Sequence, residues 1–257
     1  RSPSRGLGDV YKRQENGYPI QSNNGYIPDQ FTIEDYRDRM ARYTLEGGVV
    51  VSGSFQGFDQ TYLVDALGTL GTGFVGVTQI PETTSDEEIM NLHSHGVRGV
   101  RFNLNRGGSA GSEDLLTIAN RIYNLVGWHV ELYLGPKSLH ELKNIIPALP
   151  KVCIDHLGVS DSNFELLLNL IRSGLNIKAT GFGRVDLDVE KAIKQIHNLS
   201  PKTLMFGTDL PSTRARKKYA DNDFLKIIKF LGQKEAQKVF SSNALNFYGV
   251  ENSFTDK

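Results

Sequence analysis

The stretch from residue 96 to residue 134 opens with GVRGVRFNL (96–104), continues with a helical pattern near 112–126, and closes with WHVELYL (128–134). Its first and last segments read as strands that flank a helix. A strand, a helix and a second strand in this order form a βαβ unit, whose two strands run parallel. This stretch therefore predicts a parallel sheet that is covered by helices.

The same alternation continues along the chain. Capping pairs mark helix starts, for example Thr32 with Asp35 and Ser138 with Glu141. A doubly wound open sheet is the main alternative, but no glycine-rich phosphate turn follows the first strand. We therefore predict an α/β protein with the (β/α)8 TIM-barrel fold. Its strands are expected to begin near residues 49, 73, 97, 128, 151, 176 and 203.

The predicted barrel lacks one strand, because seven strands are found where eight are needed. The first helix, predicted at 31–46, has no strand before it, and RSPSRGLGDVYKRQ (1–14) has no strand pattern and looks foreign. We expect a gap between the strands near 49 and 203, whose open edges predict poor solubility and low activity. The expected organisation is a non-native or disordered tract at 1–17, one barrel domain at 18–250 and a tail at 251–257.

The composition argues against several classes of protein. The 257 residues include 29 basic and 29 acidic ones, so no net charge favours nucleic acid. No apolar run reaches the ~20 residues of a membrane span, and no secretory signal is found at the start. The lone cysteine, Cys153, excludes an internal disulfide and a cysteine-based zinc cluster. We expect a cytoplasmic protein that binds neither nucleic acid nor membranes, and its oligomeric state stays open.

Polar residues gather at the carboxyl ends of the predicted strands, where barrel enzymes place their active sites. Asp209 in GTDLP follows the last strand and is suited to bind a metal or act as a base, although a turn or capping role is also common. His156 in DHLG ends another strand, but a lone histidine is often structural. The alternation of strand residues turns a polar set toward the lumen: Arg101, Asn103, His129, Glu131, Tyr133, Lys178 and Thr180.

Arginines form a second group on the same rim. One alone would be an ordinary surface charge, but several together indicate binding of an anion, because guanidinium groups pair well with carboxylates. Tyr133 either donates a hydrogen bond there or serves as a core aromatic residue. His93 and His95 lie two residues apart on a predicted helix and do not face one another, so they do not form a metal pair. The rim arginines are Arg101, Arg106, Arg184 and Arg214.

At the three motifs GVRGVRFN, DHLG and GTDLP, the sequence resembles the amidohydrolase-related TIM-barrel hydrolases. Within that family it is most similar to the 2-pyrone-4,6-dicarboxylate lactonase branch. The resemblance covers roughly residues 18–249 and implies a His-x-His pair on the first strand. No such pair precedes His93, so this chain departs from the family there. Metal-dependent relatives also use a histidine on the fifth strand, where this chain has Tyr133.

The resemblance implies metal-independent hydrolysis of a small carboxylated lactone or related ester, with no cofactor. Asp209 would take a proton from the attacking water, and His156 would polarise the carbonyl group. A divalent-metal-dependent amidohydrolase or decarboxylase, with zinc or manganese on Asp209, remains an alternative. A non-catalytic binder of anionic metabolites is another. The residues expected to bind the small anionic substrate are Arg101, Tyr133, Arg184, Ser52 or Ser54, and more loosely Arg106.

Overall fold

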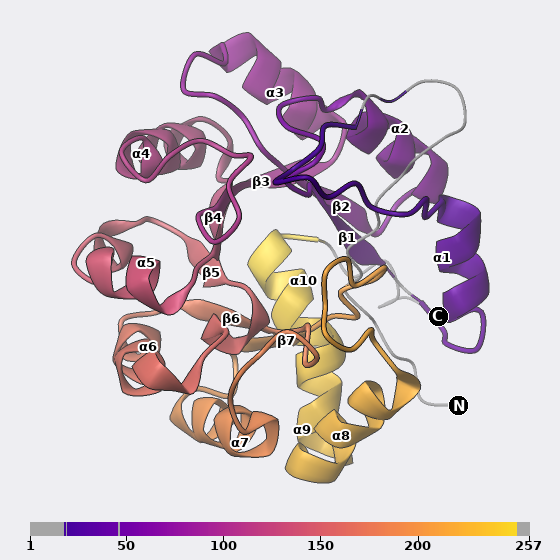
Figure 1. Cartoon of the computed structure of the whole chain (residues 1–257), viewed down its shortest axis with the longest axis vertical. Coiled ribbons are helices and arrows are strands. Elements are labelled where there is room, and N and C mark those ends of the chain that lie inside the picture. Colours follow the sequence, from indigo (N-terminus) through magenta and orange to yellow (C-terminus); the bar gives the residue numbers. More distant parts are fainter. Residues whose placement is uncertain (1–17, 19, 46, 251–257) are drawn as a thin grey trace.

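The computed structural model describes residues 18, 20–45 and 47–250, and a curled sheet of seven parallel strands lies at its centre (Figure 1). Adjacent strands in the sheet are also consecutive in the chain, from Gly48 opposite Phe74 to Ala179 opposite Phe206. The predicted barrel of parallel strands is confirmed. The strands are β1 Gly48–Val51, β2 Phe74–Thr78, β3 Val97–Asn103, β4 His129–Tyr133, β5 Val152–Ile154, β6 Asn176–Ala179 and β7 Leu204–Phe206.

Helices connect the strands and form the outer layer in Figure 1, except the last helix, which lies inside that layer. None of the described helices is long and apolar enough to cross a membrane. A π-helical turn, Lys238–Ser242, joins the last two helices. The helices are α1 Ile33–Met40, α2 Thr61–Leu70, α3 Asp86–Ser94, α4 Leu115–Val126, α5 Pro136–Glu141, α6 Phe164–Arg172, α7 Val189–Leu199, α8 Asp221–Leu231, α9 Gln233–Gln237 and α10 Asn243–Tyr248.

Two helix boundaries differ from those expected. The Thr32–Asp35 capping box forms, but α1 ends at Met40 rather than near residue 46. The capping pair proposed for Ser138 and Glu141 is wrong, because α5 starts at Pro136 and Glu141 is its last residue. Proline at the first helical position needs no backbone N–H partner and already has a helical φ, so it starts the helix two residues earlier.

The strands separate two cores. Side chains that point outward pack under the helices. Apolar side chains that point inward form a separate layer inside the barrel, together with α10. His129 belongs to this inner layer, and its ring packs against Phe247 and Tyr248 at centroid distances of 4.6 and 5.1 Å. The apolar members of the layer are Val49, Val51, Val75, Val77, Cys153, Met205, Ala244, Phe247 and Tyr248.

The described residues contain no strand between β7 and β1, which agrees with the predicted position of the gap. Helix α10 lies beside this position in Figure 1. There the side-chain amide of Asn243 donates to the carbonyl of Leu204 on β7 at 2.8 Å, so α10 satisfies part of the strand edge. The expected tract at 1–17 and tail at 251–257 lie outside the described residues.

Candidate active site

A small cleft lies at the carboxyl ends of the strands. It gathers residues that are far apart in the chain, from the loop after β1 to the loop after β7. Aromatic, cationic and carboxylate groups share its wall, which suits a small, polar, negatively charged ligand. Its lining residues are Gly53, Ser54, Phe55, Arg101, Asn103, Arg106, Tyr133, His156, Arg184, Asp209, Thr213 and Arg214.

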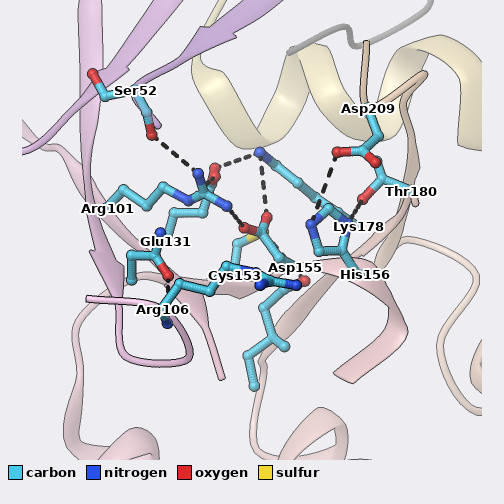
Figure 2. Close-up of polar contacts among 12 residues, drawn as sticks. Ser52, Arg101, Arg106, Glu131, Cys153, Asp155, His156, Lys178, Thr180 and Asp209 are labelled. Carbon is cyan, nitrogen blue, oxygen red and sulfur yellow. Dashed lines mark hydrogen bonds and ion pairs between the residues drawn. The ribbon is translucent and has the colours of Figure 1, made fainter. Parts of the chain in front are cut away.

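Asp209 and His156 face each other on one side of the cleft (Figure 2). Asp209 Oδ1 lies 4.0 Å from His156 Nε2, and both side chains are almost completely buried. Arg184 Nε donates to Asp209 Oδ2 at 2.6 Å, and Arg184 Nη1 donates to the carbonyl of Thr213 at 2.6 Å. The carboxylate is therefore fixed by a guanidinium group on one oxygen, while its other oxygen faces the imidazole.

The backbone at both residues adopts an uncommon conformation. His156 has φ of 51° and Asp209 has φ of 55°, which lies in the left-handed region. Histidine and aspartate tolerate this region better than most residues, but it still costs free energy outside glycine. Such strain concentrates at functional sites, where the surrounding structure holds it in place. Here the left-handed turns redirect the chain at the ends of β5 and β7, and both side chains line the cleft.

The other wall of the cleft is cationic. Arg214 stacks over the ring of Tyr26, with its guanidinium carbon 4.4 Å from the ring centroid, and its Nη1 donates to Asn23 Oδ1 at 2.7 Å. Arg106 and Arg101 line the cleft as well. The guanidinium carbon of Arg101 also lies 5.4 Å from the ring centroid of Tyr133. The four arginines predicted to share one rim therefore do so.

A group of buried charges adjoins the cleft and shares Arg101 with its lining (Figure 2). Arg101 Nη2 donates to Asp155 Oδ2 at 2.7 Å, and Lys178 Nζ lies 2.5 Å from Glu131 Oε2 and 3.7 Å from Asp155 Oδ1. We call these four residues the charge quartet; it carries two cations and two anions. Burial alone would raise the pKa of Asp155, but Arg101 and Lys178 hold that pKa well below its usual range.

Most residues expected in the site meet in the cleft, and one does not. Ser54 lines the cleft, whereas the Ser52 hydroxyl hydrogen-bonds with the hydroxyl of Tyr62 and the Ser52 carbonyl accepts from Arg101 Nη1 at 3.0 Å. Sequence reasoning missed Phe55 and Thr213, which lie in loops without a periodic pattern. The other expected residues in the cleft are Arg101, Arg106, Tyr133, His156, Arg184 and Asp209.

The donors in the cleft do not by themselves fit a divalent metal. Asp209 is already paired with the cation of Arg184, and Tyr133 at the end of β4 offers a phenol oxygen rather than an imidazole or a carboxylate. Within residues 18, 20–45 and 47–250, no three His, Cys, Asp or Glu side chains are grouped so that they could hold an ion.

A parallel barrel with a carboxylate and a histidine at the carboxyl ends of its strands has the arrangement of a TIM-barrel enzyme. The sequence matches the family described as Amidohydrolase over residues 9–250. The chain belongs to this family and is a hydrolase.

Individual relatives agree with this assignment. The chain is 30% identical to the 2-pyrone-4,6-dicarbaxylate hydrolase of Comamonas testosteroni, with 92% of this chain and 87% of that protein covered. It is 25% identical to the 4-sulfomuconolactone hydrolase of Rhizobium radiobacter, with 91% and 85% covered. The structure of a probable 2-pyrone-4,6-dicarboxylic acid hydrolase from Acinetobacter baumannii superposes with a TM-score of 0.79 at 23% identity, covering 96% of this chain and 98% of that one.

Proposed function

We propose that this protein hydrolyses the ring ester of a small lactone that carries carboxylate or sulfonate groups, without a metal ion. The observation that carries the proposal is one carboxylate, Asp209, set against His156 in a cleft lined by four arginines. The names of two relatives support the substrate class, because a pyrone dicarboxylate and a sulfomuconolactone are both anionic cyclic esters. We also propose a reducing, cytosolic location, which the lone cysteine supports.

Arginines around the cleft supply the binding step. Guanidinium groups bind carboxylate and sulfonate oxygens through paired hydrogen bonds, and they hold the ring in one orientation. Arg101, Arg106 and Arg214 lie along the cationic wall, while Arg184 contacts the catalytic carboxylate itself. Arg184 therefore positions Asp209 in addition to any contact with the substrate.

Asp209 supplies the proton transfers. Its Oδ1 takes one proton from a water molecule whose oxygen attacks the lactone carbonyl carbon, while His156 Nε2–H stabilises the negative oxygen that forms. The ring carbon–oxygen bond then breaks, and the leaving oxygen takes the proton back from Asp209. Water is consumed, one ring ester becomes a carboxylic acid and an alcohol, the acid releases its proton to the solvent, and the enzyme returns to its starting state. The first-strand histidines that the family resemblance implies would add to the oxyanion site.

The test is turnover of a panel of carboxylated and sulfonated lactones, with uncharged lactones as the comparison. Because the chain has no first-strand His-x-His pair, a second protein carries the first strand of the Comamonas testosteroni relative in place of residues 1–17. We expect hydrolysis of the charged lactones only, loss of at least about a hundredfold in kcat in Asp209→Asn, and unchanged turnover in Asp161→Asn, an exposed control.

Three outcomes would contradict the proposal. Turnover that survives Asp209→Asn would remove the assigned base. Stoichiometric bound metal, together with activity lost to a chelator and restored by zinc or manganese, would establish metal-dependent hydrolysis instead. If both proteins bind carboxylated lactones but neither turns them over, the protein is a non-catalytic binder of anions.

A further inference from the structure

The imidazole ring of His156 is held on three sides. Its Nδ1 lies 2.8 Å from Thr180 Oγ1, and its Nε2 lies 4.0 Å from Asp209 Oδ1 (Figure 2). Tyr133 packs against the ring edge to face, with the ring centroids 5.0 Å apart. The side chains of His156 and Thr180 are both buried, so bulk water does not stand in for either contact.

These contacts favour one position of the proton on a neutral ring. A neutral imidazole has one N–H group and one lone pair. Asp209 is an acceptor, so an N–H on Nε2 is attracted toward it, whereas a lone pair on Nε2 would be repelled. Nδ1 is then the acceptor, and the hydroxyl of Thr180 must be the donor, because a hydroxyl is able to donate or accept as its partner requires.

We propose that Thr180 is a positioning residue that donates its hydroxyl proton to Nδ1 of His156 and so keeps the proton of that imidazole on Nε2, directed into the cleft. The inference rests on the proposed function only for its catalytic consequence. A carbonyl oxygen that becomes negative needs an N–H donor, and a lone pair at the same position would oppose it. The tautomer therefore decides whether His156 assists the reaction.

Gly181, the residue after Thr180, also lies against the imidazole ring of His156. A β-carbon on Gly181 would lie 2.6 Å from His156 Nδ1 and 3.0 Å from Arg184 Cδ, closer than packed atoms approach. The imidazole therefore packs directly against the backbone after β6, in space that a β-carbon at position 181 would fill. The same glycine leaves space for Arg184 to reach Asp209, so one short segment aligns both partners of the carboxylate.

The first test needs no activity. The full chain, labelled with 15N-histidine, is studied by NMR at about pH 8, above the usual histidine range, with His156→Gln to identify the resonances. We expect His156 to carry its proton on Nε2 and to have a hydrogen-bonded, unprotonated Nδ1. Thr180→Val, which keeps the shape but removes the donor, should move the Nδ1 resonance toward that of an unbonded nitrogen, and Thr180→Ser should not. A proton on Nδ1 in the wild type, or an unmoved resonance in Thr180→Val, would overturn the proposal.

The second test separates positioning from packing in the enzyme that shows lactone turnover. Loss of one buried hydrogen bond predicts a fall in kcat of about threefold to tenfold in Thr180→Val, with KM nearly unchanged because the arginines are intact. Thr180→Ser should restore kcat. A change in KM alone, or Thr180→Ser impaired more than Thr180→Val, would show a packing role and overturn the inference. If no lactone is turned over, the proposed function fails while the NMR result still decides the tautomer.

Discussion

Asp155→Asn is expected to destabilise the protein strongly, because the charge quartet is balanced and almost completely buried. Asp155 accepts from Arg101 at 2.7 Å and lies 3.7 Å from Lys178. Removing its charge leaves two cations with a single anion, Glu131. Breaking one partner of a buried ion pair costs about 3–5 kcal/mol, which corresponds to a fall of roughly 10 °C in Tm for a chain of this size.

A double variant tests that reasoning against simple loss of packing. Arg101→Met with Asp155→Leu removes one charge of each sign and leaves the Lys178–Glu131 pair, whose atoms lie 2.5 Å apart. We expect the double variant to be more stable than Asp155→Asn by at least about 2 kcal/mol, since apolar replacement of a whole buried pair is close to neutral. Urea unfolding followed by the fluorescence of Trp128, the only tryptophan, measures both. A double variant no more stable than the single one would refute the charge-balance argument.

Three further predictions concern stability and use the same urea assay. Burial, and then Lys151 and Lys178, lower the pKa of His129 in the folded protein, whereas in the unfolded chain this histidine has the ordinary pKa of about 6.5. Below that pH the unfolded chain binds more protons, so the free energy of unfolding should fall on acidification by up to ~1.4 kcal/mol per pH unit. His129→Phe should reduce this slope. Gly99→Ala should cost about 1–3 kcal/mol, because its β-carbon would lie 2.4 Å from the His129 ring, whereas Gly68→Ala, in open space on α2, should not destabilise. Thr32→Ala should cost ~1 kcal/mol through loss of the capping box, and retention of full stability would contradict the capping role.

The alternation of strand residues made the inward-facing groups predictable. Arg101, Glu131 and Lys178 were expected in the lumen from local pattern alone, and the ion pairs between them confirm that they share it. The pattern is local because successive strand side chains point to opposite faces wherever the strand lies. The positions of Asp209 and His156 at strand ends followed from the same reasoning.

Contacts between strands were beyond prediction from one sequence. The pairing of His156 with Thr180 depends on the stagger between β5 and β6, which no local pattern records. Likewise, Arg214 is held by Asn23, which is 191 residues away in the chain. The end of α1 at Met40 was also missed, because the mixed polar and apolar residues of ARYTLE (41–46) suit a helix and a loop equally well. Pairwise geometry therefore requires the folded structure.

The apolar layer inside the barrel determines how small molecules enter and leave the cleft. Phe247 and Tyr248 of α10 pack among the inward-facing strand residues, so the described part of the lumen is blind at its lower end. A molecule that enters the cleft has to leave through the same mouth. In the proposed lactone hydrolysis, substrate and product would therefore exclude one another from the arginine-lined cleft. We therefore expect the product of the proposed reaction to inhibit the protein competitively.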